Sequence, residues 1–240
     1  MLDGNLRELE VFSPSVRDHA IKALIVLSKY LGVYELFKAR MKNYGIKTSR
    51  PDAFSSFLRM FNSNSEDLLE WYREALSVLR VNERLYLKFV ALTGIRKSEA
   101  LESFNLIIQL YKLGRLDAYY DQELCVLEHF KFKEKFLRRT KNVYISFVPE
   151  KLVLEIVKSR PVTYEAITKR LRRRGLETRI NELRDYYATF MVRHGLIREE
   201  VDLLQGRIPP NIFIRHYWSP SFKDLRDRTL KAVRQLEQSL

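Results

Sequence analysis

The sequence predicts a mainly α-helical protein with one small antiparallel β-sheet or hairpin. Only 8 of the 240 residues are Gly and 7 are Pro, so few positions interrupt a helix. Hydrophobic residues make up 46% of the chain, and they recur at helical spacing over most of it, which favours packed helices over disorder. Residues 124–148 are the exception, because β-branched and aromatic residues alternate there and predict the sheet.

The first 65 residues predict a small helical domain. One helix should begin at Ser13-Pro14, because Pro is favoured in the first turn, and end near Gly32. A second is expected over about residues 34–44 and a third from Pro51 onward. The apolar face of the first helix is predicted to contain Ile21, Leu24, Ile25, Leu27, Leu31 and Val33.

A polar run at residues 62–65, Asn-Ser-Asn-Ser, predicts a boundary between domains at 1–65 and 66–240. The longer helices predicted beyond it cover about residues 66–79, 83–94, 98–113 and 221–240. Between residue 149 and residue 217, shorter helices should be separated at Pro161, Gly175, Gly195 and Pro209-Pro210.

The charge balance predicts a polyanionic partner. The chain has 43 Lys and Arg against 30 Asp and Glu, a formal net charge of +13. Nucleic acid and an anionic membrane surface both fit this charge. No apolar run reaches the ~18 residues of a membrane span, and the first ten residues lack the apolar core of a signal peptide. We therefore expect a cytoplasmic protein that does not enter a membrane.

Few residues are suited to metal or nucleotide chemistry. Cys125 is the only cysteine, which excludes an intramolecular disulfide and a cysteine-rich metal site. His19, His129 and His194 have no neighbour at metal-ligand spacing. No Gly-rich phosphate loop is evident. We expect no metal site and no cofactor.

Three segments carry side chains that suit the breaking of a phosphodiester bond. They are residues 93–101 (TGIRKSEAL), 181–190 (NELRDYYATF) and 203–217 (LLQGRIPPNIFIRHY). Guanidinium groups pair with phosphate oxygens through a planar fork of donors. A lysine can protonate a leaving oxygen, and a tyrosine hydroxyl can act as the nucleophile. Each segment alone is also compatible with ordinary surface arginines or a packed aromatic side chain.

In this order, the three segments resemble the tyrosine recombinase or phage integrase family, most closely the integrases of archaeal viruses and plasmids. The resemblance covers about residues 75–220. It implies that Tyr217 is the nucleophile and that Arg96 and Arg184 bind the scissile phosphate. Glu99 either braces Arg96 or balances the charge of a helix N-terminus.

Three further catalytic candidates follow from the resemblance. The family's catalytic lysine lies on a β-hairpin, where Lys141 is the candidate and Lys133 and Lys135 are alternatives. Asn181 stands where the family usually has His, and because Asn cannot transfer a proton near neutral pH, it would only donate a hydrogen bond. Arg207 stands where the family usually has His or Trp.

The resemblance implies a site-specific recombinase or integrase, an enzyme that binds double-stranded DNA as a homo-oligomer, a dimer or tetramer, and forms a 3′-phosphotyrosyl intermediate. It also implies that residues 1–65 are a DNA-binding domain, which is short for this family. Two alternatives stay open: a non-catalytic helix-turn-helix regulator, and a type IB topoisomerase-like enzyme that only relaxes DNA. The residues predicted to contact DNA are Lys97, Lys169, Arg172, Arg173 and Arg174.

Overall fold

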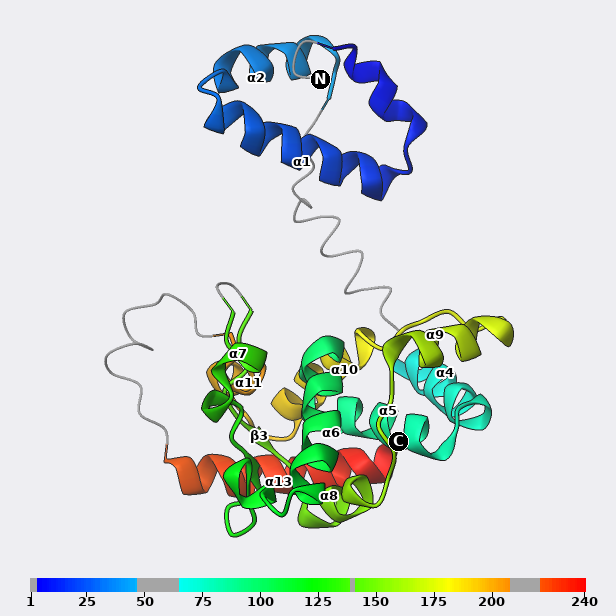
Figure 1. Ribbon diagram of the computed structural model, residues 1–240, viewed down its shortest axis with the longest axis vertical. Helices are drawn as coiled ribbons and strands as arrows, with labels where there is room; N and C mark the ends of the chain where they lie inside the picture. Colours follow the sequence, from blue (N-terminus) through cyan, green and yellow to red (C-terminus); the bar gives the residue numbers. More distant parts are fainter. Residues whose placement is uncertain (1–3, 47–64, 139–140, 208–220) are drawn as a thin grey trace. The chain divides into compact units, whose positions relative to one another are not determined.

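The computed structural model describes residues 4–46, 65–138, 141–207 and 221–240 (Figure 1). The chain divides into two compact units, Met1–Ser63 and Asn64–Leu240. It is mainly helical with a small antiparallel sheet, so the predicted fold class is confirmed. Within the described ranges, no helix has both the length and the apolar character needed to span a membrane.

The first unit contains a 3-10 helix η1 (Leu6–Val11) and two antiparallel helices, α1 (Pro14–Tyr30) and α2 (Tyr34–Asn43). Its small core is formed by Leu6, Ile21, Leu24, Phe37 and Met41.

The apolar face predicted for α1 is only partly correct. Ile21 and Leu24 are buried, but Leu27 and Leu31 are 42% and 54% exposed. In this short unit, α1 packs against its neighbours through the face that carries Ile21, Leu24 and Ser28, which leaves an adjacent apolar stripe uncovered. The third helix, predicted from Pro51, lies outside the described residues.

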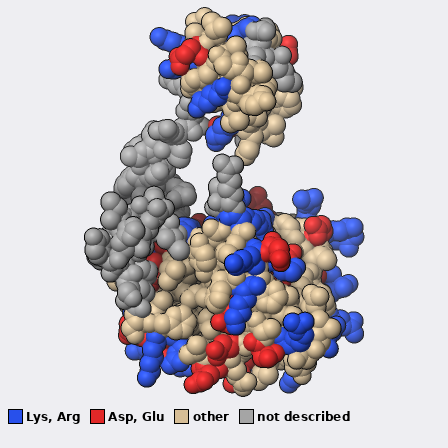
Figure 2. Space-filling model, turned by 60° about the vertical axis from the view of Figure 1, so that its left-hand side comes forward, with Lys and Arg blue, Asp and Glu red and all other residues tan. Residues whose placement is uncertain are grey.

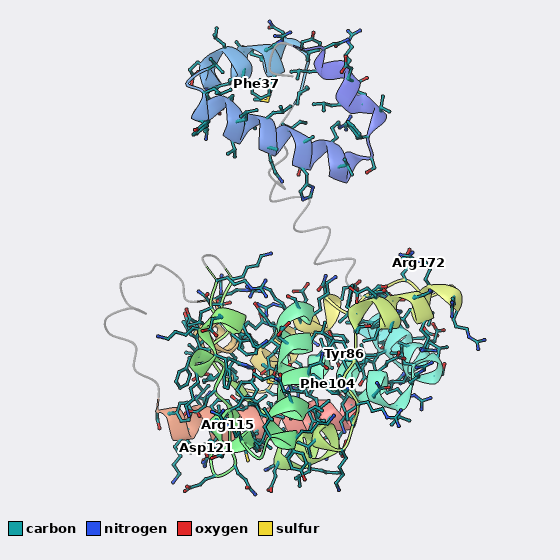
Figure 3. All side chains as sticks on the ribbon, in the orientation of Figure 1. Phe37, Tyr86, Phe104, Arg115, Asp121 and Arg172 are labelled. Carbon is teal, nitrogen blue, oxygen red and sulfur yellow. The ribbon has the colours of Figure 1, made fainter. Side chains whose placement is uncertain are left out.

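Helix α5 (Val81–Thr93) lies at the centre of the second unit. It packs against α6 (Lys97–Lys112), α8 (Glu150–Val157), α10 (Glu182–Arg193) and α13 (Phe222–Ser239) (Figure 1). Because it has neighbours on several sides, it is apolar around most of its circumference. The Tyr86 ring meets the Phe104 ring of α6 edge to face, with centroids 5.9 Å apart (Figure 3). Two further helices, α4 (Ser65–Val78) and α9 (Tyr164–Arg173), pack against each other.

The sheet has three strands of two residues each in the order β1-β2-β3, all antiparallel. The strands are β1 (Tyr120–Asp121), β2 (Val126–Leu127) and β3 (Ser146–Phe147). A sheet was predicted over 124–148, but much of that segment is not strand. The 3-10 helix η3 (His129–Lys131) and the short helix α7 (Lys133–Phe136) interrupt it. Within this segment, the buried His129 ring is hydrogen-bonded to Tyr119 and Ser146.

The carboxyl-terminal helix α13 packs within its own chain. Its predicted apolar stripe is confirmed, because Leu225, Leu230, Val233 and Leu236 are buried. Helix α11 (Arg198–Leu204) is joined to α13 by an ion pair in which the Arg228 guanidinium donates to the buried Glu200 carboxylate. The two elements on either side of residues 208–220 are therefore fixed in one unit.

Candidate active site

The first arginine motif begins at a turn that only glycine fits. Gly94 ends α5 with φ +61°, in the left-handed region that favours glycine. A Cβ on Gly94 would lie 2.1 Å from Cδ1 of the Tyr187 ring of α10. The chain therefore passes directly over Tyr187 before α6 begins, which sets Arg96 at the N-cap position of α6.

Arg96 is held in place by a buried carboxylate. Its Nη1 donates to Oε1 of Glu99 at 2.7 Å, and its backbone N–H donates to Oε2 at 3.2 Å. The Glu99 side chain is 1% exposed, whereas that of Arg96 is 25% exposed. Nη1 of Arg96 also donates to the Asn142 carbonyl at 3.3 Å. Glu99 thus braces Arg96, and the guanidinium lies at the junction of α6 with the loop containing Asn142.

The buried side chain of Arg184 links the turn at Gly94 to the turn at Gln205. It is 7% exposed, and its Nη1 donates to the Gly94 carbonyl at 3.0 Å while its Nη2 donates to the Gln205 carbonyl at 2.8 Å. Burial, together with the positive charges of Arg207 and Arg96, lowers the pKa of Arg184 to about 10. The guanidinium stays charged at neutral pH, and both other arginines act on it electrostatically. A bound anion would relieve this like-charge repulsion.

The hairpin that carries Lys141 packs against the Gly206 turn. Leu137 and Asn142 form a β-bridge, and the Arg138 N–H donates to the Lys141 carbonyl at 3.3 Å. Gly206 has φ +70°, and a Cβ there would lie 1.7 Å from the Asn142 carbonyl oxygen. The same carbonyl accepts from Arg96, so the hairpin, the Gly206 turn and the start of α6 meet at one place.

The other predicted catalytic residues come from segments next to those above in the chain. The Arg207 side chain is 50% exposed, with Nη1 3.6 Å from Asp202 Oδ1. Asn181 is exposed at the N-cap of α10, where its carbonyl accepts from the Arg184 N–H at 3.2 Å. Lys141 is exposed on the hairpin. Tyr217 lies outside the described residues.

The alternative lysines belong to α7. Nζ of Lys135 pairs with Glu102 at 3.0 Å, and Lys133 is exposed. In the part of the chain that the structure describes, no group of three or more His, Cys, Asp or Glu side chains is arranged to hold a metal ion.

The predicted DNA contacts fall into two groups. Lys97 begins α6, and its Nζ donates to the Tyr164 hydroxyl at 2.7 Å, which holds it against α9. Lys169, Arg172, Arg173 and Arg174 are all exposed, and Figure 3 shows Arg172 projecting outward from α9. Figure 2 shows Lys and Arg side chains protruding from the visible face of this unit, with acidic side chains among them.

Sequence reasoning missed the residues that join the motifs. Gln205 and Asn142 contact the predicted arginines but had no assigned role. The Gly between Gln205 and Arg207 signals a tight turn, but the sequence contains no signal that its neighbour would be the hairpin backbone.

A comparison with protein families found a match that covers most of the second unit. A family model described as archaeal phage integrase matches residues 61–223. Comparisons with curated proteins and with solved structures found no match. The matched range contains all three arginines, the hairpin and Tyr217.

Proposed function

Because the chain belongs to the archaeal phage integrase family, and so has an integrase role with DNA as its partner, we propose that it cuts and rejoins DNA through Tyr217. In this proposal Tyr217 becomes joined to a DNA 3′-phosphate, and residues 66–240 carry the chemistry. Residues 1–65 add contacts to the double helix, and two or four copies act together on DNA.

The observation that supports this proposal most strongly is the meeting of three arginine-bearing elements. Arg96, Arg184 and Arg207 come from the start of α6, from α10 and from the turn after α11. Arg184 contacts the turns that precede Arg96 and Arg207, and the positive charges of these two arginines lower its pKa. Glu99 and Asp202 offset part of the charge of Arg96 and Arg207, but Arg184 still feels a net repulsion from these two arginines. A phosphate diester is an anion that guanidinium forks fit.

The groups divide the reaction between them. The Tyr217 hydroxyl gives up its proton to water as its oxygen attacks the phosphorus in line, forming a phosphotyrosyl bond while the bond to the 5′-oxygen breaks. Arg96, Arg184 and Arg207 stabilise the negative charge on the non-bridging oxygens. Lys141 gives a proton to the leaving 5′-oxygen, and Asn181 donates a hydrogen bond to the phosphate.

The second half of the reaction reverses the first. A 5′-hydroxyl of a second strand attacks the phosphotyrosyl link, so a phosphodiester is restored and the tyrosine is released. The energy of the broken bond is kept in the covalent link. For this reason, the proposed cycle uses no nucleotide cofactor.

The exposed side chains of α9 supply backbone contacts to DNA. Lys169, Arg172, Arg173 and Arg174 extend from a single short helix and its C-terminal turn. Contacts of this type position a protein on DNA without reading its sequence. Lys97, which follows Arg96 at the start of α6 and is held by Tyr164 at the start of α9, adds a further contact to the DNA backbone.

A nicked suicide substrate tests the proposal. The short 5′-hydroxyl fragment produced by cleavage diffuses away, so an enzyme that uses Tyr217 accumulates a covalent protein–DNA complex. We expect this complex with the natural chain and none with Tyr217→Phe, which keeps the ring and loses the attacking oxygen. The readout is a denaturing gel with labelled DNA.

Two controls make the result specific. Tyr111→Phe removes a hydroxyl from an exposed tyrosine on α6 and should leave adduct formation unchanged. A Tyr217→Phe protein that still forms the adduct would overturn the assignment of the nucleophile. A natural chain that binds the substrate but never forms an adduct would favour a non-catalytic DNA-binding role.

A further inference from the structure

Gln205 makes a reciprocal connection with Arg184. Its backbone carbonyl accepts from the Arg184 guanidinium at 2.8 Å, and its own Nε2 donates to the Arg184 backbone carbonyl at 2.9 Å. Gln205 is 0% exposed and directly precedes Gly206 and Arg207. One residue thus holds both the main chain and the side chain of Arg184 against the turn that carries Arg207.

The hydrogen bonds with Gln205 and the remaining bond of the Arg184 guanidinium lead to different turns. The other bond of its guanidinium goes to Gly94, on the opposite turn. The Gln205 side-chain amide is therefore the group that ties the α10 backbone to the turn after α11. If it were lost, the longer and more flexible Arg184 side chain would still join α10 to this turn through the Gln205 carbonyl, but the direct link from the α10 backbone would be gone.

The remaining polar atom of Gln205 favours a functional role. Its Oε1 is buried and accepts no hydrogen bond within the part of the chain that the structure describes. An unpaired buried acceptor lowers stability, so an apolar residue of similar length would stabilise the fold better unless the donor half of the amide were needed.

We propose that Gln205 is a positioning residue for the arginine cluster. By donating to the Arg184 carbonyl, it sets the register between α10 and the Gly206–Arg207 turn, so that Arg184 and Arg207 face the same phosphate. The inference rests on the proposed function, since it assigns Gln205 a role in binding the phosphate of that reaction. Gln205 itself does not touch the substrate.

Two variants test the role of the amide. Gln205→Met keeps the length of the side chain and removes both polar atoms. Gln205→Glu keeps an acceptor oxygen but can donate to the Arg184 carbonyl only when protonated. Thr229→Val is the matched control, because Thr229 is also fully buried with an unpaired oxygen but lies on α13.

The first readout is binding of inorganic phosphate, measured as the rise in melting temperature that it causes. The second is the single-turnover rate of adduct formation on the nicked substrate. For Gln205→Met we expect most of the phosphate effect to be lost and the rate to fall by about 10- to 100-fold, since small displacements of catalytic groups cost that much. Thr229→Val should match the natural chain in both.

The pH profile separates positioning from general destabilisation. The rate of Gln205→Glu relative to that of the natural chain should rise as the pH falls from about 8 to about 5.5, because a buried carboxyl gains its proton and again donates. A purely structural defect predicts a ratio that is flat or falls with pH.

The possible outcomes lead to different conclusions. If Gln205→Met keeps both the phosphate effect and the rate, or if the Gln205→Glu ratio does not rise, the positioning role is wrong. If phosphate stabilises the natural chain but not Gln205→Met, and the natural chain forms no adduct, the positioning role stands and the proposed chemistry fails.

Discussion

Arg184 shows, at the scale of single residues, how a buried cation is kept charged. Two backbone carbonyls accept from its guanidinium, and its pKa falls only to about 10, so it carries a positive charge throughout the neutral range. Arginine suits this position because a lysine with the same burial would lose its proton more readily. The fold therefore presents a fixed positive group beneath the proposed phosphate site.

His129 makes the stability of the second unit depend on pH. It is completely buried, with Nδ1 2.7 Å from the Tyr119 hydroxyl and Nε2 2.8 Å from Ser146 Oγ. Burial lowers its pKa to about 3. The unfolded chain titrates near pH 6.5, so between these values the unfolded state binds more protons. The stabilisation is complete above about pH 6.5 and is lost progressively as the pH falls towards 3.

We predict that the free energy of unfolding falls between pH 7 and pH 5, by up to about 1.4 kcal/mol per pH unit from this one histidine. His129→Gln should weaken that dependence, and His194→Gln, which changes an exposed histidine, should leave it intact. Urea unfolding at several pH values measures both slopes. An unchanged slope in His129→Gln would show that another group controls the acid response.

The sequence indicates the arginine and tyrosine candidates because they stand within recognisable local motifs, and their catalytic roles stay predictions. It does not indicate the groups that join them. Asn142 and Gln205 accept from the arginines through backbone carbonyls, which every residue has, so these contacts leave little signal in the sequence. The donation from the Gln205 side chain to Arg184 depends on tertiary packing that the local motif does not indicate. Nothing in the local sequence indicates that His129 is buried, because its neighbours are charged and aromatic.

At the scale of elements, helix positions were more predictable than strands. The ends of α5 and α6 fall within two residues of their predicted positions. Gly94 ends α5, and the same turn separates it from the start of α6. The sheet was harder to predict because its strands have two residues each, too few for an alternating pattern to stand out. Strand pairing depends strongly on tertiary context, which local propensity does not capture.

The glycine turns offer a direct test of how the elements meet. Gly206 and Gly175 have nearly the same backbone, φ +70° and +74°, but a Cβ would strike the Asn142 carbonyl only at Gly206. Replacing either glycine with alanine should lower the free energy of unfolding by about 1 kcal/mol through backbone strain. We predict a further loss of about 1–3 kcal/mol for Gly206→Ala alone, because the hairpin must move.

Urea denaturation of the two alanine variants measures this difference in the free energy of unfolding. Gly206→Ala should also slow adduct formation, whereas Gly175→Ala should not. Equal stabilities would mean that the turn after α11 and the hairpin are not in the contact described.

At the scale of the whole molecule, the formal net charge of +13 predicts DNA binding that weakens steeply with salt. Each neutralised phosphate adds about 0.9 to the slope of log K against log salt concentration. If the side chains of α9 contact the DNA backbone, replacing Lys169, Arg172 and Arg173 with Ala should reduce that slope by about 2 to 3.

A fluorescence titration of labelled duplex DNA at several salt concentrations gives the slope. Arg115→Ala is the control, because Arg115 is exposed and lies far from Arg172 in the view of Figure 3. A triple variant that keeps the slope of the natural chain would remove α9 from the DNA-binding surface.

The central claim is that arginines from separate elements neutralise the charge of one phosphate during cleavage. The most direct measurement compares Arg96→Ala with the natural chain on two nicked substrates, one with a normal scissile phosphate and one with an uncharged methylphosphonate there. We predict a rate loss of about 10²- to 10³-fold on the phosphate and a much smaller loss on the methylphosphonate, which has less charge to stabilise. An equal loss on both substrates would contradict the account.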